Sequence, residues 1–570
     1  MALLSRAAAA ARRAPPPLIS RGGRQIRGHA SEQHGGGRQV AVVGGGLTGL
    51  TTAYLLAKQL PASARITLYE SSDRLGGWIR TDRVRVNVNG TRGVVPFERG
   101  PRTLSSLRGN TWRYDDLVLY ELMLDLGLKP AYPKDLPRYL YYPDHLVKMP
   151  PDASVFDCLR EPLFRECIWG ALGTAASFFT GRHRGALPAE DLSVADWLRL
   201  VTGEGTVGRN LVSAMIHGIY GGDIERLSAR SVLDRMYYNV HLPPALSGRR
   251  HVPAHELAFV ERMAQDEMVC AAANRPKGSL IHFGAQGMEA LPKALEDALA
   301  GQSNVTIRRQ TPVTNISYLE QEDKVQVTSK DQSQLYDHVV STSSSDELVK
   351  STGDTLSTLA DIESVSIMTV NLWYPIENMK PPGFGYLIPH AVPAAQNPER
   401  ALGVFFDSDV ISERGPDEPA GTKLFVLMGG HYYKSHGDAA AAAPPPPSED
   451  EAIAQARSLL ERHLGIPRGT PCHAMARLAR GCIPQHNVGH GAMLRRADEQ
   501  LTAAFGGRLT VANGSYGRVG AMGALRNAHG AAHAVVSGHK SSGLEDFTRD
   551  PVIADVPITE IPCRQPQITR

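Results

Sequence analysis

Six residues near the start of the chain have the spacing that binds a dinucleotide. Residues 44–49 read GGGLTG, a G-x-G-x-x-G pattern, directly after an apolar run at residues 38–43 that is typical of a buried strand. In this pattern Gly44 permits a tight turn, Gly46 lets the backbone approach a pyrophosphate, and Gly49 allows close helix packing. The helix that follows would offer unpaired N–H groups to the phosphates.

A strand–helix–strand unit must position this loop. After residue 49 comes a helical stripe of Leu50, Ala53, Tyr54, Ala57 and Leu60, and then a strand over residues 66–70. That strand ends on Glu70, where a carboxylate can accept hydrogen bonds from both ribose hydroxyls. A plain turn glycine is the structural alternative, but the order strand, loop, helix, strand and acid favours nucleotide binding.

A second glycine pair favours FAD over NAD. Residues 70–81 read ESSDRLGGWIRT, which resembles the R-x-G-G extension of glutathione-reductase-like flavoproteins, where the backbone meets the FAD pyrophosphate. Residues 97–102, FERGPR, resemble the segment that lies beside the flavin in amine-oxidase-like enzymes.

Further blocks in the same order resemble the mitochondrial, oxygen-dependent protoporphyrinogen oxidases over about residues 38–540. They are PRYLY at 137–141, IHGIYGGD at 216–223, GFGYL at 383–387, CIPQH at 482–486 and GSYGRVGA at 514–521. Two departures are His486, where that family has Tyr, and Met522-Gly523, where it often has Asn-Asp.

The resemblance implies oxidation of protoporphyrinogen IX to protoporphyrin IX in haem biosynthesis, with six electrons passing in three FAD cycles to O2 to give H2O2. It implies one noncovalent FAD per chain, in line with the lack of Cys in residues 514–521. The cofactor-binding residues that we expect are Gly44, Gly45, Gly46, Leu47, Thr48, Gly49, Glu70, Ser71, Arg74, Gly76, Gly77, Trp78, Gly100, Pro101, Arg102, Thr103, Val313, Val519, Gly520 and Ala521.

The substrate would be an apolar macrocycle with two propionates, so its pocket needs apolar walls and a cationic anchor. The resemblance places Arg138 on a propionate, and Phe384, Leu387 and Leu427 against the rings. Gly218 would let a backbone carbonyl reach the pyrrole N–H groups. An exposed surface Arg, ordinary core packing and a turn glycine are the structural alternatives. We assign no catalytic acid or base and no metal ligand.

Composition supports a globular, multidomain chain with a targeting sequence at its N-terminus. The 570 residues are 42% hydrophobic and 21% charged, and the net charge of +3 gives no reason to expect nucleic acid as a partner. Residues 1–37 begin with an Arg-rich stretch free of acidic residues, which predicts a mitochondrial transit peptide. A disordered tail is the alternative, because Pro15 to Pro17 would break a helix.

We expect an α/β fold: a Rossmann-like FAD-binding domain of the glutathione-reductase/amine-oxidase type, a mixed α+β substrate domain and a helical membrane-contacting lobe. The FAD domain is assigned to 38–131, 278–348 and 491–540, and the substrate domain to 132–141, 231–277 and 349–490. The lobe is assigned to 142–230, where the apolar run 167–179 suits an interfacial helix, with a buried helix as the alternative. Residues 439–447 form a low-complexity insertion, and 541–570 a C-terminal tail.

The expected location is the surface of the inner mitochondrial membrane, on the intermembrane-space face, with ferrochelatase as a possible partner and a homodimer as a possible state. A polyamine or monoamine oxidase is the alternative enzyme, although neither its aromatic cage nor its lysine is recognisable. A non-catalytic prenyl-binding protein of the same fold is a third hypothesis. Such a protein would not need the combination of Glu70 with Gly76 and Gly77, which this sequence has.

Overall fold

A computed structural model describes most of the chain. The described residues are 37–105, 116–133, 135–185, 187–242, 249–275, 278, 280–330, 332–411, 413–434, 445–548 and 552–557. The predicted transit peptide, apart from residue 37, and most of the 439–447 insertion lie outside these ranges.

A five-stranded parallel sheet carries the glycine loop. Its order is β10 (Val305–Arg308), β2 (Arg65–Tyr69), β1 (Gln39–Val43), β14 (His338–Ser341) and β20 (Leu509–Val511). Every pairing is parallel, and the central β1 is buried on both faces, which explains its continuous apolar sequence. The three segments predicted for the FAD domain each contribute strands to this sheet.

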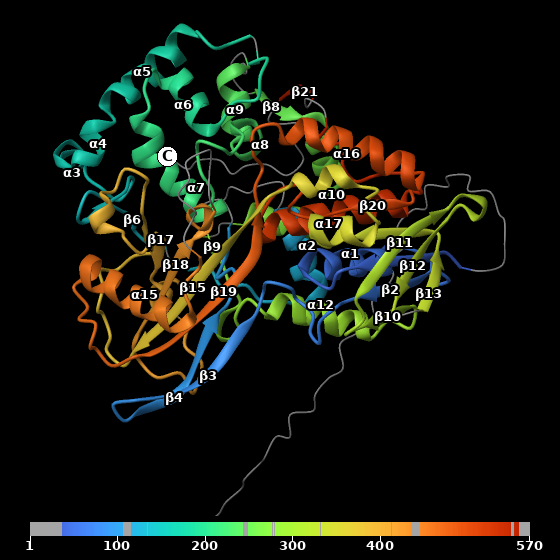
Figure 1. Cartoon of the computed structure of the whole chain (residues 1–570), viewed down its shortest axis with the longest axis horizontal. Helices are drawn as coiled ribbons and strands as arrows, with labels where there is room; N and C mark the ends of the chain where they lie inside the picture. The colour runs from blue at the N-terminus through green and yellow to red at the C-terminus, as the bar shows by residue number, and fades with distance from the viewer. Residues whose placement is uncertain are drawn as a thin grey trace, which may run out of the picture.

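Helices cover one face of this sheet and share one core (Figure 1). They are α1 (Leu47–Gln59), α2 (Asp116–Leu126), α10 (Ala254–Met263), α11 (Glu267–Asn274), α12 (Ala290–Ala300) and α17 (Ala521–Val536). The helices α10 and α11 therefore belong to the core of the parallel-sheet domain, although residues 231–277 were assigned to the substrate domain. Their apolar residues Phe259, Val260 and Val269 are buried in that core, and sequence order alone does not reveal this.

The other face of the parallel sheet is covered by a small antiparallel sheet and by helices. These elements are β11 (Val313–Leu319), β12 (Lys324–Ser329), β13 (Gln332–Tyr336), α13 (Ser345–Ser351) and α16 (His490–Phe505).

A seven-stranded mixed sheet forms the second domain. Its order is β19 (His473–Pro484), β15 (Ser364–Tyr374), β18 (Thr422–Gly429), β17 (Ala401–Phe405), β16 (Gly385–Leu387), β6 (Arg138–Tyr141) and β7 (Leu146–Lys148). Helix α15 (Glu449–Leu464) packs on one face, and α14 (Asp407–Val410) follows β17. The hairpin of β3 (Thr81–Val88) and β4 (Thr91–Glu98) packs against Trp373 of this sheet, although it falls within the range predicted for the FAD domain.

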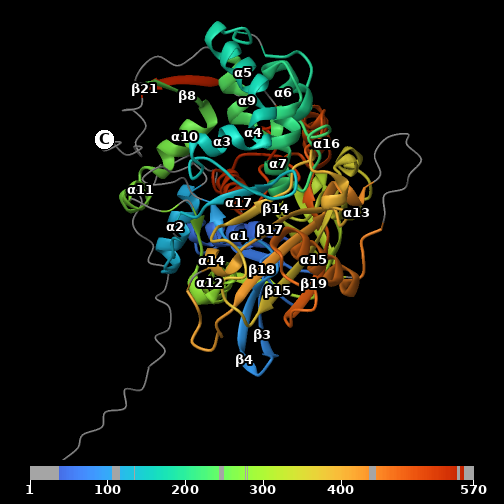
Figure 2. The same ribbon diagram turned by 90° about the vertical axis from the view of Figure 1, so that its left-hand side faces the viewer.

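A helical lobe lies above the seven-stranded sheet in Figure 1 and is seen from the side in Figure 2. It contains α3 (Val155–Arg160), α4 (Pro162–Glu166), α5 (Ile168–Thr180), α6 (Val194–Thr202), a π-helical turn (Gly208–Val212), α7 (Ser213–Tyr220), α8 (Ala229–Val232) and α9 (Asp234–His241). None of the helices in the described ranges is both long and apolar enough to cross a bilayer.

Two short strand pairs connect distant parts of the chain. The strand β5 (Leu104–Ser105) pairs with β9 (Leu280–Ile281). In the predicted tail, β21 (Ile553–Pro557) pairs with β8 (Arg249–Pro253), so this part of the tail is structured.

Candidate active site

The two glycine loops lie directly against each other at the end of the parallel sheet. Gly76 N donates to Gly45 O at 2.9 Å, and a Cβ on Gly77 would lie 3.1 Å from the Cα of Gly46. Gly44 has a φ of +106°, and a Cβ on Gly49 would lie 1.8 Å from Gly44 O. Side chains at Gly49 and Gly77 would clash with the facing backbone, so the close packing of these loops requires glycine, as in a dinucleotide-binding fold.

Glu70 lies beside this loop, where the sequence placed the ribose-binding acid. Its Oε2 accepts a hydrogen bond from Gly45 N at 2.8 Å, and its Oε1 accepts from Ser72 N at 2.8 Å and Ser71 Oγ at 3.3 Å. The backbone carbonyl of Glu70 accepts from Thr311 N at 2.8 Å, which brings the start of β11, and thus Val313, to the same edge.

Arg74 folds over its own loop. The guanidinium donates to the carbonyls of Leu75 at 2.8 Å, Ile79 at 3.3 Å and Gly77. Arg74 therefore holds the Gly76-Gly77 turn in shape. Trp78 is 45% exposed.

The Arg102 side chain is occupied by protein groups. It is 6% exposed, and its Nε donates to both Asp407 carboxylate oxygens at 2.9 and 3.0 Å. Its other nitrogens donate to Gly100 O, Glu98 O and Asn371 Oδ1 at 2.8 to 3.1 Å. Because the guanidinium is occupied in this way, a contact of this segment with a cofactor would come from the backbone of Gly100 to Thr103.

A cavity of about 1680 Å³ lies between the parallel sheet, the seven-stranded sheet and the helical lobe. It brings together residues that the sequence assigned to two different sites. From the cofactor set it is lined by Pro101, Thr103, Val519, Gly520 and Ala521. From the substrate set it is lined by Arg138, Gly218, Phe384 and Leu387. The N-terminus of the sixteen-residue helix α17 begins at this wall, at Ala521.

Arg138 and Phe384 lie together at this wall. Arg138 is exposed, and its guanidinium carbon lies 5.5 Å from the centre of the Phe384 ring. Such a cation can bind a carboxylate while its plane packs near an aromatic ring.

Gly218 and Leu387 fit closely, whereas Leu427 lies elsewhere. A Cβ on Gly218 would lie 3.0 Å from both Leu387 methyl carbons, so this helix position has little room for a larger residue. Leu427 is absent from the residues that line the cavity in the described part of the chain. It packs beside Val365, Ile367 and Leu402, and so the structure places it in a hydrophobic core.

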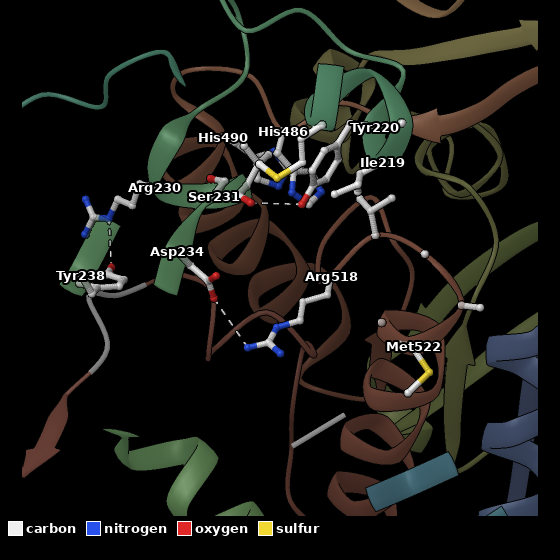
Figure 3. Close-up of a pocket in the computed structure, with 18 of the residues that line it drawn as sticks. Ile219, Tyr220, Arg230, Ser231, Asp234, Tyr238, His486, His490, Arg518 and Met522 are labelled. Atoms are coloured by element: carbon white, nitrogen blue, oxygen red, sulfur yellow. Dashed lines mark hydrogen bonds and ion pairs between the residues drawn. The ribbon is translucent and has the colours of Figure 1, made fainter. Parts of the chain in front are cut away.

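Sequence reasoning missed several polar wall residues (Figure 3). Arg518 lies 3.7 Å from Asp234 and 3.2 Å from Glu256, and Arg230 contacts the Tyr238 hydroxyl at 3.3 Å. Arg518 falls inside the GSYGRVGA block at 514–521, so its position near the cofactor could have been predicted from the sequence. Asp234, Tyr238 and Glu256 come from α9 and α10, and only the tertiary structure brings them to the cavity.

A stacked histidine pair forms part of the same wall. The rings of His486 and His490 lie 4.1 Å apart and are buried. Burial lowers the pKa of His486 to about 4 and holds the pKa of His490 well below its ordinary value. Both imidazoles are therefore neutral near pH 7, which suits a wall facing an uncharged ring system.

Two apposed glycine loops and a large cavity between two domains are typical of a nucleotide-dependent oxidoreductase. Residues 47–475 match the family described as flavin containing amine oxidoreductase, and the chain belongs to that family. It is therefore a flavin-dependent oxidoreductase, as the sequence predicted.

Individual relatives are similar over nearly their whole length. The chain is 29% identical to the protoporphyrinogen oxidase of Schizosaccharomyces pombe, covering 88% of this chain and 99% of that protein. It is 28% identical to the human protoporphyrinogen oxidase, covering 89% of this chain and all of that protein. Among solved structures, cyclohexylamine oxidase from Brevibacterium oxydans has a TM-score of 0.56 at 17% identity, with 88% and 99% of the two chains covered. The similarity to cyclohexylamine oxidase shows that the two chains share a fold.

Proposed function

We propose that this protein oxidises protoporphyrinogen IX to protoporphyrin IX, with noncovalent FAD as cofactor and O2 as electron acceptor. The observation that carries the proposal is the cavity in which Arg138 and an apolar wall face the predicted flavin-contacting segment 519–521. Its volume of about 1680 Å³ exceeds the roughly 300–1000 Å³ of ordinary ligand pockets, as a tetrapyrrole beside a flavin ring requires. The curated relatives named above act on this substrate class.

The protein's own residues would bind FAD and the substrate and orient them toward each other. The two glycine loops and Glu70 would hold the FAD pyrophosphate and ribose, and the N-terminus of α17 would face the flavin ring. FAD supplies the acceptor for a hydride from the substrate. Arg138 would bind a propionate by charge-assisted hydrogen bonds, while Phe384 and Leu387 would pack against the pyrroles and exclude water.

The decisive experiment mixes the purified flavin-containing protein with protoporphyrinogen IX under air and follows porphyrin fluorescence and H2O2. We expect turnover well above the autoxidation rate, with three H2O2 per porphyrin because six electrons leave in three two-electron steps. A panel of polyamines and monoamines tests the alternative enzyme class. Amine turnover without porphyrin formation would refute the proposal.

We also propose a peripheral position on the inner mitochondrial membrane, at the intermembrane-space face, after removal of a transit peptide within residues 1–37. The supporting observation is α5, which exposes Ile168, Trp169, Leu172 and Phe179 by 46%, 74%, 54% and 84%. A helix with such exposed side chains suits the interface of a bilayer. A membrane-side position would allow transfer of the product to ferrochelatase, and a homodimer would place two such helices on one surface.

A further inference from the structure

Three histidines from distant segments meet behind the cavity wall. His217 lies on α7, His390 follows β16, and His431 lies in the helical turn η6 (Gly430–Tyr433) after β18. One ring nitrogen of each lies within 4.8 Å of the other two, and the ring centres are 4.5 to 5.1 Å apart. None of the three side chains is among the residues that line the cavity, so this cluster is separate from the site described above.

The hydrogen bond of His217 fixes its tautomer. Its Nδ1 lies 3.0 Å from the carbonyl oxygen of Ile388, which can only accept, so Nδ1 carries the proton and Nε2 carries a lone pair. That Nε2 lies 3.1 Å from Nε2 of His431. Metal-binding histidines commonly donate their second ring N–H to a backbone carbonyl in this way.

His390 supplies a nitrogen without a partner. Its Nε2 is buried and has no hydrogen-bond partner among the described residues. A buried polar atom in this state costs free energy, and a metal ion would satisfy it. The centre of the His390 ring lies 4.5 Å from that of His217 and 5.1 Å from that of His431, so this ring already lies beside the pair.

Charge in the neighbourhood suits a cation. The Asp223 carboxylate acts electrostatically on both His217 and His390, and Glu225 also acts on His390. The Arg209 guanidinium opposes them at His390, but Asp223 supplies a negative charge near both rings. That charge would offset part of the cost of a buried dication.

We propose that His217, His390 and His431 bind one divalent transition-metal ion of borderline softness, with Zn²⁺ as the expected ion. Three imidazole nitrogens suit such an ion, and tetrahedral Zn–N bonds of about 2.0 Å place ligand nitrogens about 3.3 Å apart. The 3.1 Å between His217 and His431 is close to that spacing. The ion would join α7 to the segments after β16 and β18, and would thereby fix Gly218 against Leu387. This role does not depend on the proposed reaction.

The test measures metal in the full-length, flavin-containing protein purified from zinc-supplemented cultures. Metal content is determined by mass spectrometry as purified, after EDTA dialysis, and after Zn²⁺ is returned. The variants are His390→Gln and His431→Gln. The matched control is His473→Gln, at a half-buried histidine in β19 of the seven-stranded sheet. We expect close to one Zn²⁺ per chain in the wild type and the control, and at least about tenfold weaker binding in the two variants.

X-ray absorption at the zinc edge identifies the ligands independently of the variants. Three nitrogen neighbours at about 2.0 Å with histidine-type outer scattering are expected. Metal content below about a tenth of an ion per chain, or binding unchanged in both variants, would overturn the proposal. A spectrum dominated by sulfur or water ligands would also overturn it, even if the variants fail to fold.

Discussion

Arg102 and Asp407 form a buried, two-bond ion pair that joins the segment beside the glycine loops to the seven-stranded sheet. The Arg102 Nε lies 2.9 and 3.0 Å from the two carboxylate oxygens, and both side chains are about 5% exposed. Burial and the partner charges act in opposite directions on these groups: burial lowers the pKa of Arg102, while Asp407 raises it. The pair connects the two domains whose boundary forms the cavity.

Removing one member of this pair should destabilise the protein strongly. Arg102→Met leaves the Asp407 carboxylate buried without its main counter-charge, which typically costs about 3–5 kcal/mol. We expect a lower thermal midpoint and partial loss of flavin. The double variant Arg102→Met/Asp407→Leu should recover much of the stability, because Asp407 no longer leaves a buried carboxylate without its main counter-charge. Equal midpoints for the single variant and the wild type would contradict this role.

Arg138 should affect substrate binding and leave flavin binding unchanged. Arg138→Ala removes the cationic anchor at the cavity, and we expect KM to rise by roughly tenfold or more, because a charge-assisted hydrogen bond contributes about 1.5–3 kcal/mol. The ratio of flavin to protein absorbance should stay at the wild-type value. Arg138→Lys, which keeps the charge, is the control. Its KM should lie between those of the wild type and Arg138→Ala. Flavin loss with an unchanged KM would place Arg138 at the wrong site.

Acidification should destabilise the protein in part through the buried histidines. The pKa of His486 is lowered to about 4, so in the folded state it stays neutral where an unfolded histidine is protonated, below about pH 6.5. The unfolded state therefore binds more protons, and the free energy of unfolding falls as pH drops from about 6.5 to about 4, by about 1.4 kcal/mol per pH unit for one such group.

The variant His486→Gln checks this dependence. Denaturant titrations at a series of pH values should give a shallower pH dependence for the variant than for the wild type. His539→Gln, at an exposed histidine, serves as the control and should keep the wild-type slope. A variant curve parallel to the wild type would show that His486 titrates normally.

Helix α5 should carry membrane binding. The double variant Trp169→Ser/Phe179→Ser removes two of its most exposed apolar side chains, and we expect reduced co-sedimentation with vesicles of anionic lipid. Ile376→Ser, at an exposed position on another part of the surface, is the matched control. Folding and oxidase activity in detergent should remain, because neither residue lines the cavity. Unchanged sedimentation of the double variant would refute a membrane role for α5.

The nucleotide-binding unit is predictable from local sequence alone. The strand at 39–43, the loop at 44–49 and the acid Glu70 are close in sequence, and their geometry follows from local backbone requirements of glycine and of a buried parallel strand. The family was also readable, because the blocks that carry it are contiguous. For the same reason Gly218 and Leu387 were predicted as substrate-binding residues, although the sequence does not reveal that they contact each other.

The contacts that these residues make depend on long-range packing. Arg102 pairs with Asp407, 305 positions away, so its guanidinium is occupied by protein groups. Leu427 is partly buried and packs against Val365, Ile367 and Leu402, since the face of a strand that lines a cavity depends on its neighbours in the sheet. His217, His390 and His431 have no recognisable spacing along the chain. Long-range packing brings them together, and no local pattern encodes that packing.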